Sequence, residues 1–274
     1  SEYSIKNHQQ AKIKIENLIK KYPNEKKLLQ TAGILFAQNK KFEDAIKIFK
    51  KILEKDLQSV EVLINIGLAY YESNKFDQAL NYLEKAENLD TRQGDVFYSL
   101  GLIYEKKQIP IKALEYYQKA INIDSSNIGA FLNLANVHMQ NKEFEKSINA
   151  YENAIMADPK NPDIYHNLGV AWSKIQKIDK AIDNYLKAMQ LNSKNPLTYF
   201  NLGYLYFQNS NFELPKLEEA ELKFKKAIEI DPNTAKFYYN LGWVETKLGK
   251  YDSAIGNYIK ALKIDPNYTS ARFN

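Results

Sequence analysis

The sequence predicts an all-α protein, a solenoid in which pairs of helices stack along the chain. Two observations predict it: a small residue returns every 34 residues through most of the chain, and each 34-residue stretch carries two helical faces. The composition supports a folded core, because 45% of the 274 residues are hydrophobic and 26% are charged.

The small residues set the frame of the repeat. The first five intervals between them are 34 residues long and the last is 39. They are Gly33, Gly67, Gly101, Ala135, Gly169, Gly203 and Gly242. Counting each as position 8 defines full units at 26–59, 60–93, 94–127, 128–161, 162–195, 196–234 and 235–268, with five inserted residues in the sixth unit.

Each unit is predicted to form two helices. Positions 4, 7, 8 and 11 share one face of a first helix, and positions 17, 20, 21, 24 and 27 share one face of a second. Small residues at positions 8 and 20 should let the two helices of a pair approach closely. Aromatic residues at positions 4, 11 and 24 should fill the space between units. One pair cannot bury its apolar face alone, so neighbouring units must stack.

Irregularities mark the sixth unit, the seventh unit and both ends. Pro215 is expected to open a second helix that is about one turn longer than the others and runs to Ile230. Glu245 replaces an aromatic residue or histidine, so its carboxylate should be paired or partly exposed. Residues 1–25 fit a partial repeat and 269–274 fit the start of another. We therefore expect either a fragment of a longer array or a last helix that a partner covers.

These columns resemble the tetratricopeptide repeat (TPR) family over residues 26–268. The resemblance implies a right-handed superhelix of antiparallel helix pairs. It also implies that the first helices line a concave groove that holds a peptide or the surface of a partner protein.

In this frame the groove positions carry asparagine and aromatic residues. Position 6 is asparagine in five of seven units, which predicts a ladder of amides able to bond a peptide backbone. Alternatively, these amides bond neighbouring helices. The aromatic residues predict an apolar binding patch, concentrated in units six and seven. The candidate groove residues are Asn65, Asn133, Asn167, Asn201, Asn240, Tyr98, Phe200, Tyr204, Phe207, Tyr239 and Trp243.

The residues do not indicate catalysis, metal or cofactor binding, nucleic-acid binding or membrane insertion. The chain has no cysteine, no histidine spacing of the metal-binding type and no glycine-rich phosphate loop, so we expect no catalytic residue, no metal and no cofactor. Only two of the 38 basic residues are arginine, which disfavours nucleic acid as a partner. No stretch is long and apolar enough to predict membrane insertion.

The sequence therefore predicts a scaffold for protein–protein interaction that binds an extended peptide or a partner helix in its groove. Two alternatives stay open. The asparagine ladder resembles that of the repeat domain of O-linked N-acetylglucosamine transferases, so the chain could select substrates for a larger, glycosyltransferase-like enzyme. It could also be a scaffold that self-associates end to end. The sequence does not assign a compartment.

Overall fold

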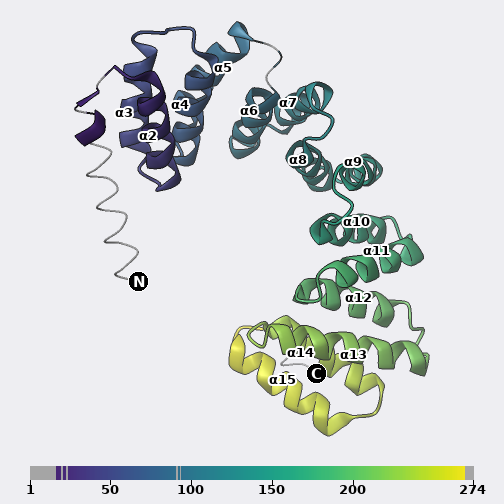
Figure 1. Ribbon diagram of the computed structural model, residues 1–274. Coiled ribbons are helices and arrows are strands. Elements are labelled where there is room, and N and C mark those ends of the chain that lie inside the picture. Colours follow the sequence, from purple (N-terminus) through teal and green to yellow (C-terminus); the bar gives the residue numbers. More distant parts are fainter. Residues whose placement is uncertain (1–16, 20, 23, 91, 93, 269–274) are drawn as a thin grey trace. The chain divides into compact units, whose positions relative to one another are not determined.

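Figure 1 shows the computed structural model of the chain, which describes residues 17–19, 21–22, 24–90, 92 and 94–268. In this described part all regular secondary structure is helical. Most of the predicted partial repeat at 1–25, and all of 269–274, lie outside the described residues.

The helices follow one another in pairs joined by short turns. They are α2 (Lys26–Gln38), α3 (Phe42–Leu53), α4 (Val60–Glu72), α5 (Phe76–Leu89), α6 (Gly94–Lys106), α7 (Pro110–Ile123), α8 (Ile128–Gln140), α9 (Phe144–Ala157), α10 (Pro162–Lys174), α11 (Ile178–Leu191), α12 (Pro196–Gln208), α13 (Leu214–Ile230), α14 (Ala235–Lys247) and α15 (Tyr251–Ile264). This all-α solenoid architecture confirms the predicted fold class.

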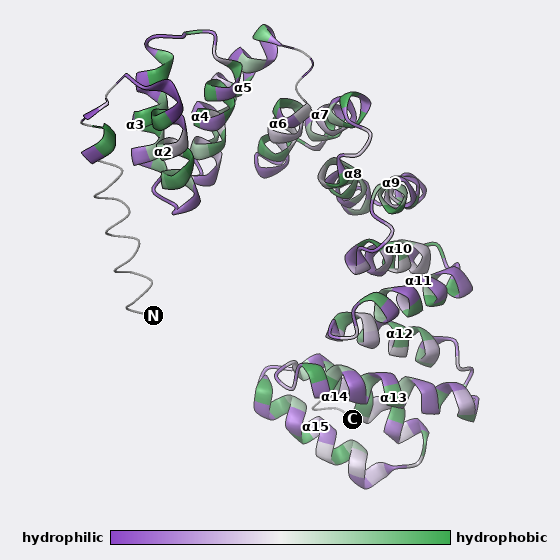
Figure 2. Cartoon of the chain, viewed as in Figure 1, coloured by the Kyte–Doolittle hydropathy of each residue, from purple (hydrophilic) through white to green (hydrophobic). Residues whose placement is uncertain are grey.

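Contacts divide the chain into unit 1, residues 1–130, and unit 2, residues 131–274, and each is described by itself. Within each unit a helix packs against its neighbours in sequence, and the first helices of successive pairs also touch, as α2 touches α4 and α12 touches α14. Figure 2 shows hydrophobic and hydrophilic residues alternating around the helices, as expected where one stripe of each helix is buried.

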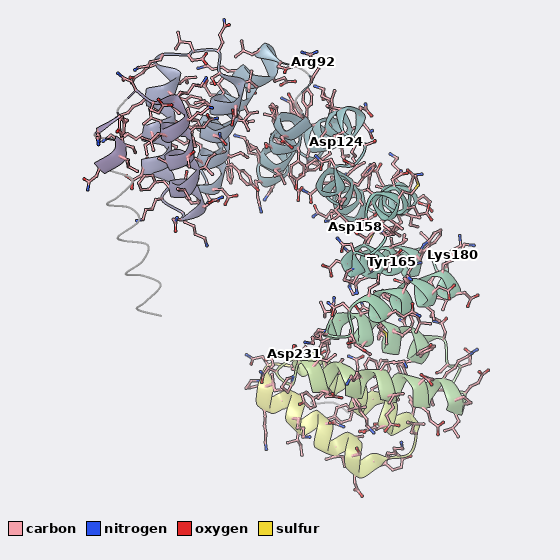
Figure 3. The ribbon with its side chains drawn as sticks, viewed as in Figure 1. Arg92, Asp124, Asp158, Tyr165, Lys180 and Asp231 are labelled. Atoms are coloured by element: carbon pink, nitrogen blue, oxygen red, sulfur yellow. The ribbon has the colours of Figure 1, made fainter. Side chains whose placement is uncertain are left out.

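Short polar turns set the ends of the helices. Asp124, Asp158 and Asp231, labelled in Figure 3, end their helices and accept a hydrogen bond from the backbone N–H two residues later. These bonds use the side chain to close the turn that precedes the next pair. In the sixth pair, Pro215 lies in the first turn of α13, which has 17 residues where α11 and α15 have 14. The predicted lengthening of this helix is confirmed.

Glycine at position 8 lies against the large side chain at position 24 of its own pair. A Cβ atom built on Gly101 would lie 2.5 Å from the ring of Tyr117, closer than side chains approach each other, and Tyr117 is fully buried. The same contact joins Gly33 to Phe49, Gly67 to Leu83, Gly169 to Tyr185, Gly203 to Phe224 and Gly242 to Tyr258. The prediction that the position-24 side chains lie between units is wrong in these pairs, because each of them packs against the glycine of its own pair.

Position 24 is tyrosine in several pairs, and the hydroxyl group of some of these tyrosines reaches the first helix of the pair, as in the fourth pair. Tyr151 is buried and donates a hydrogen bond to Oδ1 of Asn136 at 2.5 Å. Burial raises the pKa of Tyr151 to about 12, because the phenolate would lose its hydration inside the protein.

The raised pKa of Tyr151 predicts a loss of stability in alkali. The folded state holds the proton more tightly than the unfolded state, whose tyrosine pKa is about 10, so this stabilisation is complete below pH 10 and disappears as the pH rises towards 12. Between pH 9 and pH 11 the Tyr151 group should cost about 1.4 kcal/mol of unfolding free energy. Urea unfolding at both pH values should show that Tyr151→Phe loses less stability than the wild type. Equal losses of stability in the two proteins would contradict the raised pKa of Tyr151 in the folded state.

Candidate functional site

The first helices of unit 2 line a pocket with a volume of about 600 Å³. We call it the unit 2 pocket. It is lined by Val170, Ser173, Lys174, Gln176, Ile178, Tyr185, Phe200, Asn201, Tyr204, Leu205, Gln208, Lys236, Tyr239, Asn240, Trp243 and Tyr268. Most of these side chains come from α10, α12 and α14, so three successive pairs build one site.

The aromatic residues of this region separate into core and surface. Phe200 and Phe207 are 4% and 8% exposed, so they are not part of an open aromatic patch as predicted. The Phe200 ring packs on Phe237 at 5.1 Å between centroids, and Phe207 packs on Trp243 at 4.6 Å. The neighbouring pair buries them because their rings complete the core between α12, α13 and α14.

The aromatic surface of the pocket is therefore made by half-buried residues. Tyr204, Tyr239 and Trp243 all line it and all remain partly exposed. Trp243 lies 6.4 Å from Tyr239 between ring centroids, and Tyr239 lies 5.3 Å from Tyr268. Three rings are therefore grouped around Tyr239 of α14, where they can contact a large apolar side chain.

Two of the predicted asparagines meet in the unit 2 pocket. Asn240 is buried and donates from Nδ2 to the backbone oxygen of Lys236 at 2.8 Å. The side chain of Asn201 lies near the hydroxyl of Tyr185, a buried residue whose pKa is raised by burial. The Asn240 amide thus uses part of its capacity within the protein, and an amide can make up to four hydrogen bonds. This internal bond holds the Asn240 amide in a fixed orientation at the pocket wall, with Asn201 beside it in the lining.

Among the described residues that line the unit 2 pocket, the charged side chains are two lysines. Lys174 ends α10, and Lys236 lies in the first turn of α14. The Lys236 ammonium also lies 4.7 Å from the centroid of the Phe200 ring, a cation–π distance. Because no aspartate or glutamate is among the described residues that line it, the pocket favours a ligand that carries negative charge.

The other predicted groove residues lie elsewhere. Asn65 and Tyr98 line a second pocket of about 470 Å³, which we call the unit 1 pocket. It is lined by Ile34, Val60, Glu61, Ile64, Asn65, Leu68, Asp95, Tyr98, Ser99 and Leu102. Asn133 on α8 and Asn167 on α10 are half-buried and line neither pocket.

The sequence analysis missed part of the unit 2 pocket. The pattern of asparagine and aromatic residues did not indicate four polar side chains of the first helices that line the pocket, which are Ser173, Lys174, Gln208 and Lys236. Tyr185 is a buried residue of the second helix α11, and Tyr268 is the last residue of the seventh unit, after the end of α15. The repeat frame placed neither residue in the groove.

Glu245 lies on α14 but does not line the unit 2 pocket. Its carboxylate is 1% exposed and accepts hydrogen bonds from Ser253 Oγ and Asn257 Nδ2, each at 2.7 Å. The prediction that this acid is paired is confirmed, although its partners are neutral. Over the described ranges of the chain we find no cluster of three metal-binding side chains. The helices that the structure describes include none with the length and apolar character of a membrane span.

Comparison with known families decides the identity of the repeat. A TPR repeat model matches residues 67–108, 139–176, 174–210 and 211–244, which is more than half of the chain. Two tetratricopeptide repeat models match residues 94–127 and 235–268. The chain belongs to the tetratricopeptide repeat family. This TPR chain is therefore a repeat-built interaction scaffold, a class that uses extended concave surfaces for binding.

Solved structures agree on the fold. The C-terminal part of a TPR repeat-containing protein from Cytophaga hutchinsonii superposes with a TM-score of 0.72 at 21% identity, covering 88% of this chain and 97% of that one. YrrB, a TPR protein with an unusual peptide-binding site, has a TM-score of 0.58 at 23% identity, covering 70% and 96%. MamA has a TM-score of 0.57 at 24% identity, covering 62% and 96%. The search of curated proteins returns no match.

Proposed function

We propose that this TPR chain binds a segment of a partner protein in the unit 2 pocket. The observation that carries the proposal is the combination of half-buried rings, asparagine amides and lysines around one pocket of about 600 Å³. That volume lies in the range of about 300–1,000 Å³ that ligand sites commonly occupy. YrrB, which shares the fold, is described as having a peptide-binding site, and this supports the same kind of ligand here.

The side chains that line the pocket indicate which kind of partner segment it would bind. The rings of Tyr239, Trp243 and Tyr268 offer a surface for an aromatic or large aliphatic side chain. Asn201 and Asn240 can use their remaining capacity for the N–H and C=O groups of an extended backbone. The two lysines favour acidic residues in the same segment. We therefore expect a peptide in which aromatic and acidic residues alternate.

Binding of a designed peptide tests this function. The probe is a fluorescein-labelled peptide of about eight residues that alternates phenylalanine and aspartate, titrated with the whole chain and followed by anisotropy. Trp243→Ala should weaken binding at least tenfold, because aromatic anchors in partly desolvated sites contribute about 2 kcal/mol or more. Lys174→Gln, which changes only a surface side chain, should weaken it about threefold.

The control is Tyr251→Ala, which removes an aromatic ring that is 64% exposed and lies outside the pocket. It should leave the affinity within about twofold of the wild type. The proposal fails if Tyr251→Ala weakens binding as much as Trp243→Ala, or if neither substitution changes it. Melting temperatures of all three variants report any change in folding.

A further inference from the structure

The unit 1 pocket differs from the unit 2 pocket in its walls. It is formed by the first helices α2, α4 and α6, and half of the residues that line it are aliphatic. Ile64, Leu68 and Leu102 are half-buried there, and Ile34 is 38% exposed. Its volume of about 470 Å³ leaves room for aliphatic side chains of a bound segment. These walls supply apolar surface that a ligand can remove from water.

Two carboxylates stand beside this apolar surface. Glu61 lies in the first turn of α4 and Asp95 in the first turn of α6, and both are exposed. Neither carboxylate has an ion-pair or hydrogen-bond partner in the part of the chain that the structure describes, and no lysine or arginine is among the residues lining the pocket. Both charges are therefore available to a ligand.

The negative potential extends beyond the pocket along the same helices. Tyr71 lies on α4 near Tyr98, one of the lining residues, and is half-buried. Burial, together with the carboxylates of Glu72 and Glu105, raises the pKa of Tyr71, because the phenolate would add a negative charge to a negative region. A cationic ligand would meet an attractive potential over several residues of α4 and α6.

We propose that the unit 1 pocket is a second binding site, which takes a partner segment with aliphatic side chains flanked by lysine or arginine. The aliphatic side chains contact Ile34, Ile64 and Leu102, and the cations pair with Glu61 and Asp95. The unit 2 pocket, whose charged lining residues are lysines, selects the opposite charge. One chain thus carries two sites that do not compete for the same peptide.

Two labelled peptides of about eight residues test this site on the whole chain. One alternates lysine with leucine, and the other alternates glutamate with leucine. The lysine peptide should bind at least tenfold more tightly than the glutamate peptide, and its affinity should fall as NaCl rises from about 50 to 200 mM. A glutamate peptide that binds equally well would overturn the proposal, as would an affinity that salt does not change.

Substitutions locate the binding. The double variant Glu61→Gln with Asp95→Asn should lower the affinity for the lysine–leucine peptide about tenfold, and Ile34→Ala should lower it about threefold. The matched control, Glu25→Gln with Glu54→Gln, removes two exposed acids of unit 1 that do not line the pocket and should stay within about twofold. If the control weakens binding as much as the pocket variant, the attraction is due to net charge and the proposal is wrong.

Two further binding measurements distinguish this site from its alternatives. A peptide that alternates lysine with serine should bind at least fivefold more weakly than the lysine–leucine peptide, because it cannot fill the aliphatic surface. Equal binding would refute the apolar half of the proposal. Trp243→Ala should leave the affinity for the lysine–leucine peptide unchanged, because Trp243 lines the unit 2 pocket and not the unit 1 pocket. The experiments therefore distinguish a wrong proposal for the unit 2 pocket from a wrong proposal for the unit 1 pocket.

Discussion

Replacing Tyr117 by alanine is expected to lower the free energy of unfolding by about 3–5 kcal/mol, as for other large aromatic residues removed from a core. The ring is fully buried, fills the space that Gly101 leaves open, and donates its hydroxyl hydrogen to Glu105 at 2.6 Å. Alanine would leave a cavity between α6 and α7 and an unpaired carboxylate beside it. Urea unfolding followed by circular dichroism measures the loss.

Two variants of α7 serve as controls. One measures the contribution of the Tyr117 hydroxyl, and the other measures the effect of removing an exposed side chain from the same helix. Tyr117→Phe keeps the ring and should cost only about 1 kcal/mol, the usual value of one hydrogen bond. Ile111→Ala removes a side chain that is 80% exposed on the same helix and should change stability by less than about 0.5 kcal/mol. If Tyr117→Ala costs no more than Ile111→Ala, glycine and ring do not form the core contact described above.

Glu245→Ala is expected to lower the free energy of unfolding by about 2–4 kcal/mol. The carboxylate is buried and accepts hydrogen bonds from Ser253 and Asn257, and Asn257 is itself buried. Alanine would leave the Asn257 amide without its acceptor and open a cavity between α14 and α15. The measurement is again urea unfolding at neutral pH.

The amide variant and an exposed acid serve as controls for Glu245. Glu245→Gln keeps the size and one acceptor oxygen, so it should cost about 1–2 kcal/mol and less than the alanine variant. Glu152→Ala removes an exposed carboxylate on α9 and should have little effect. A neutral result for Glu245→Ala would mean that desolvation of the carboxylate offsets both of its hydrogen bonds.

Helix positions were predictable because they depend on local patterns. The 34-residue spacing and the two apolar faces of each unit indicated helix pairs, and Pro215 indicated the longer α13, which ends at Ile230 as expected. The same patterns identified the repeat family. A proline in a first turn or a periodic apolar stripe acts over a few residues, so the sequence expresses it directly.

The composition of the pockets depended on packing between pairs. Phe200 and Trp243 both occupy predicted groove positions, yet Phe200 is buried against Phe237 and Phe224 while Trp243 remains partly exposed. Position within a repeat could not distinguish them, because the exposure of a ring depends on which side chains the neighbouring helices bring against it.

By itself the sequence determined the helices, their pairing and the family, since each follows from periodicity within one unit. Only the tertiary structure decided which rings, amides and charges share a pocket. Tyr268 and Tyr185 joined the unit 2 pocket from outside the predicted groove positions, and Glu61 and Asp95 came together at the unit 1 pocket from separate repeats. The physical reason is that a binding site on stacked helices is assembled from neighbours in space that are about one repeat apart in sequence.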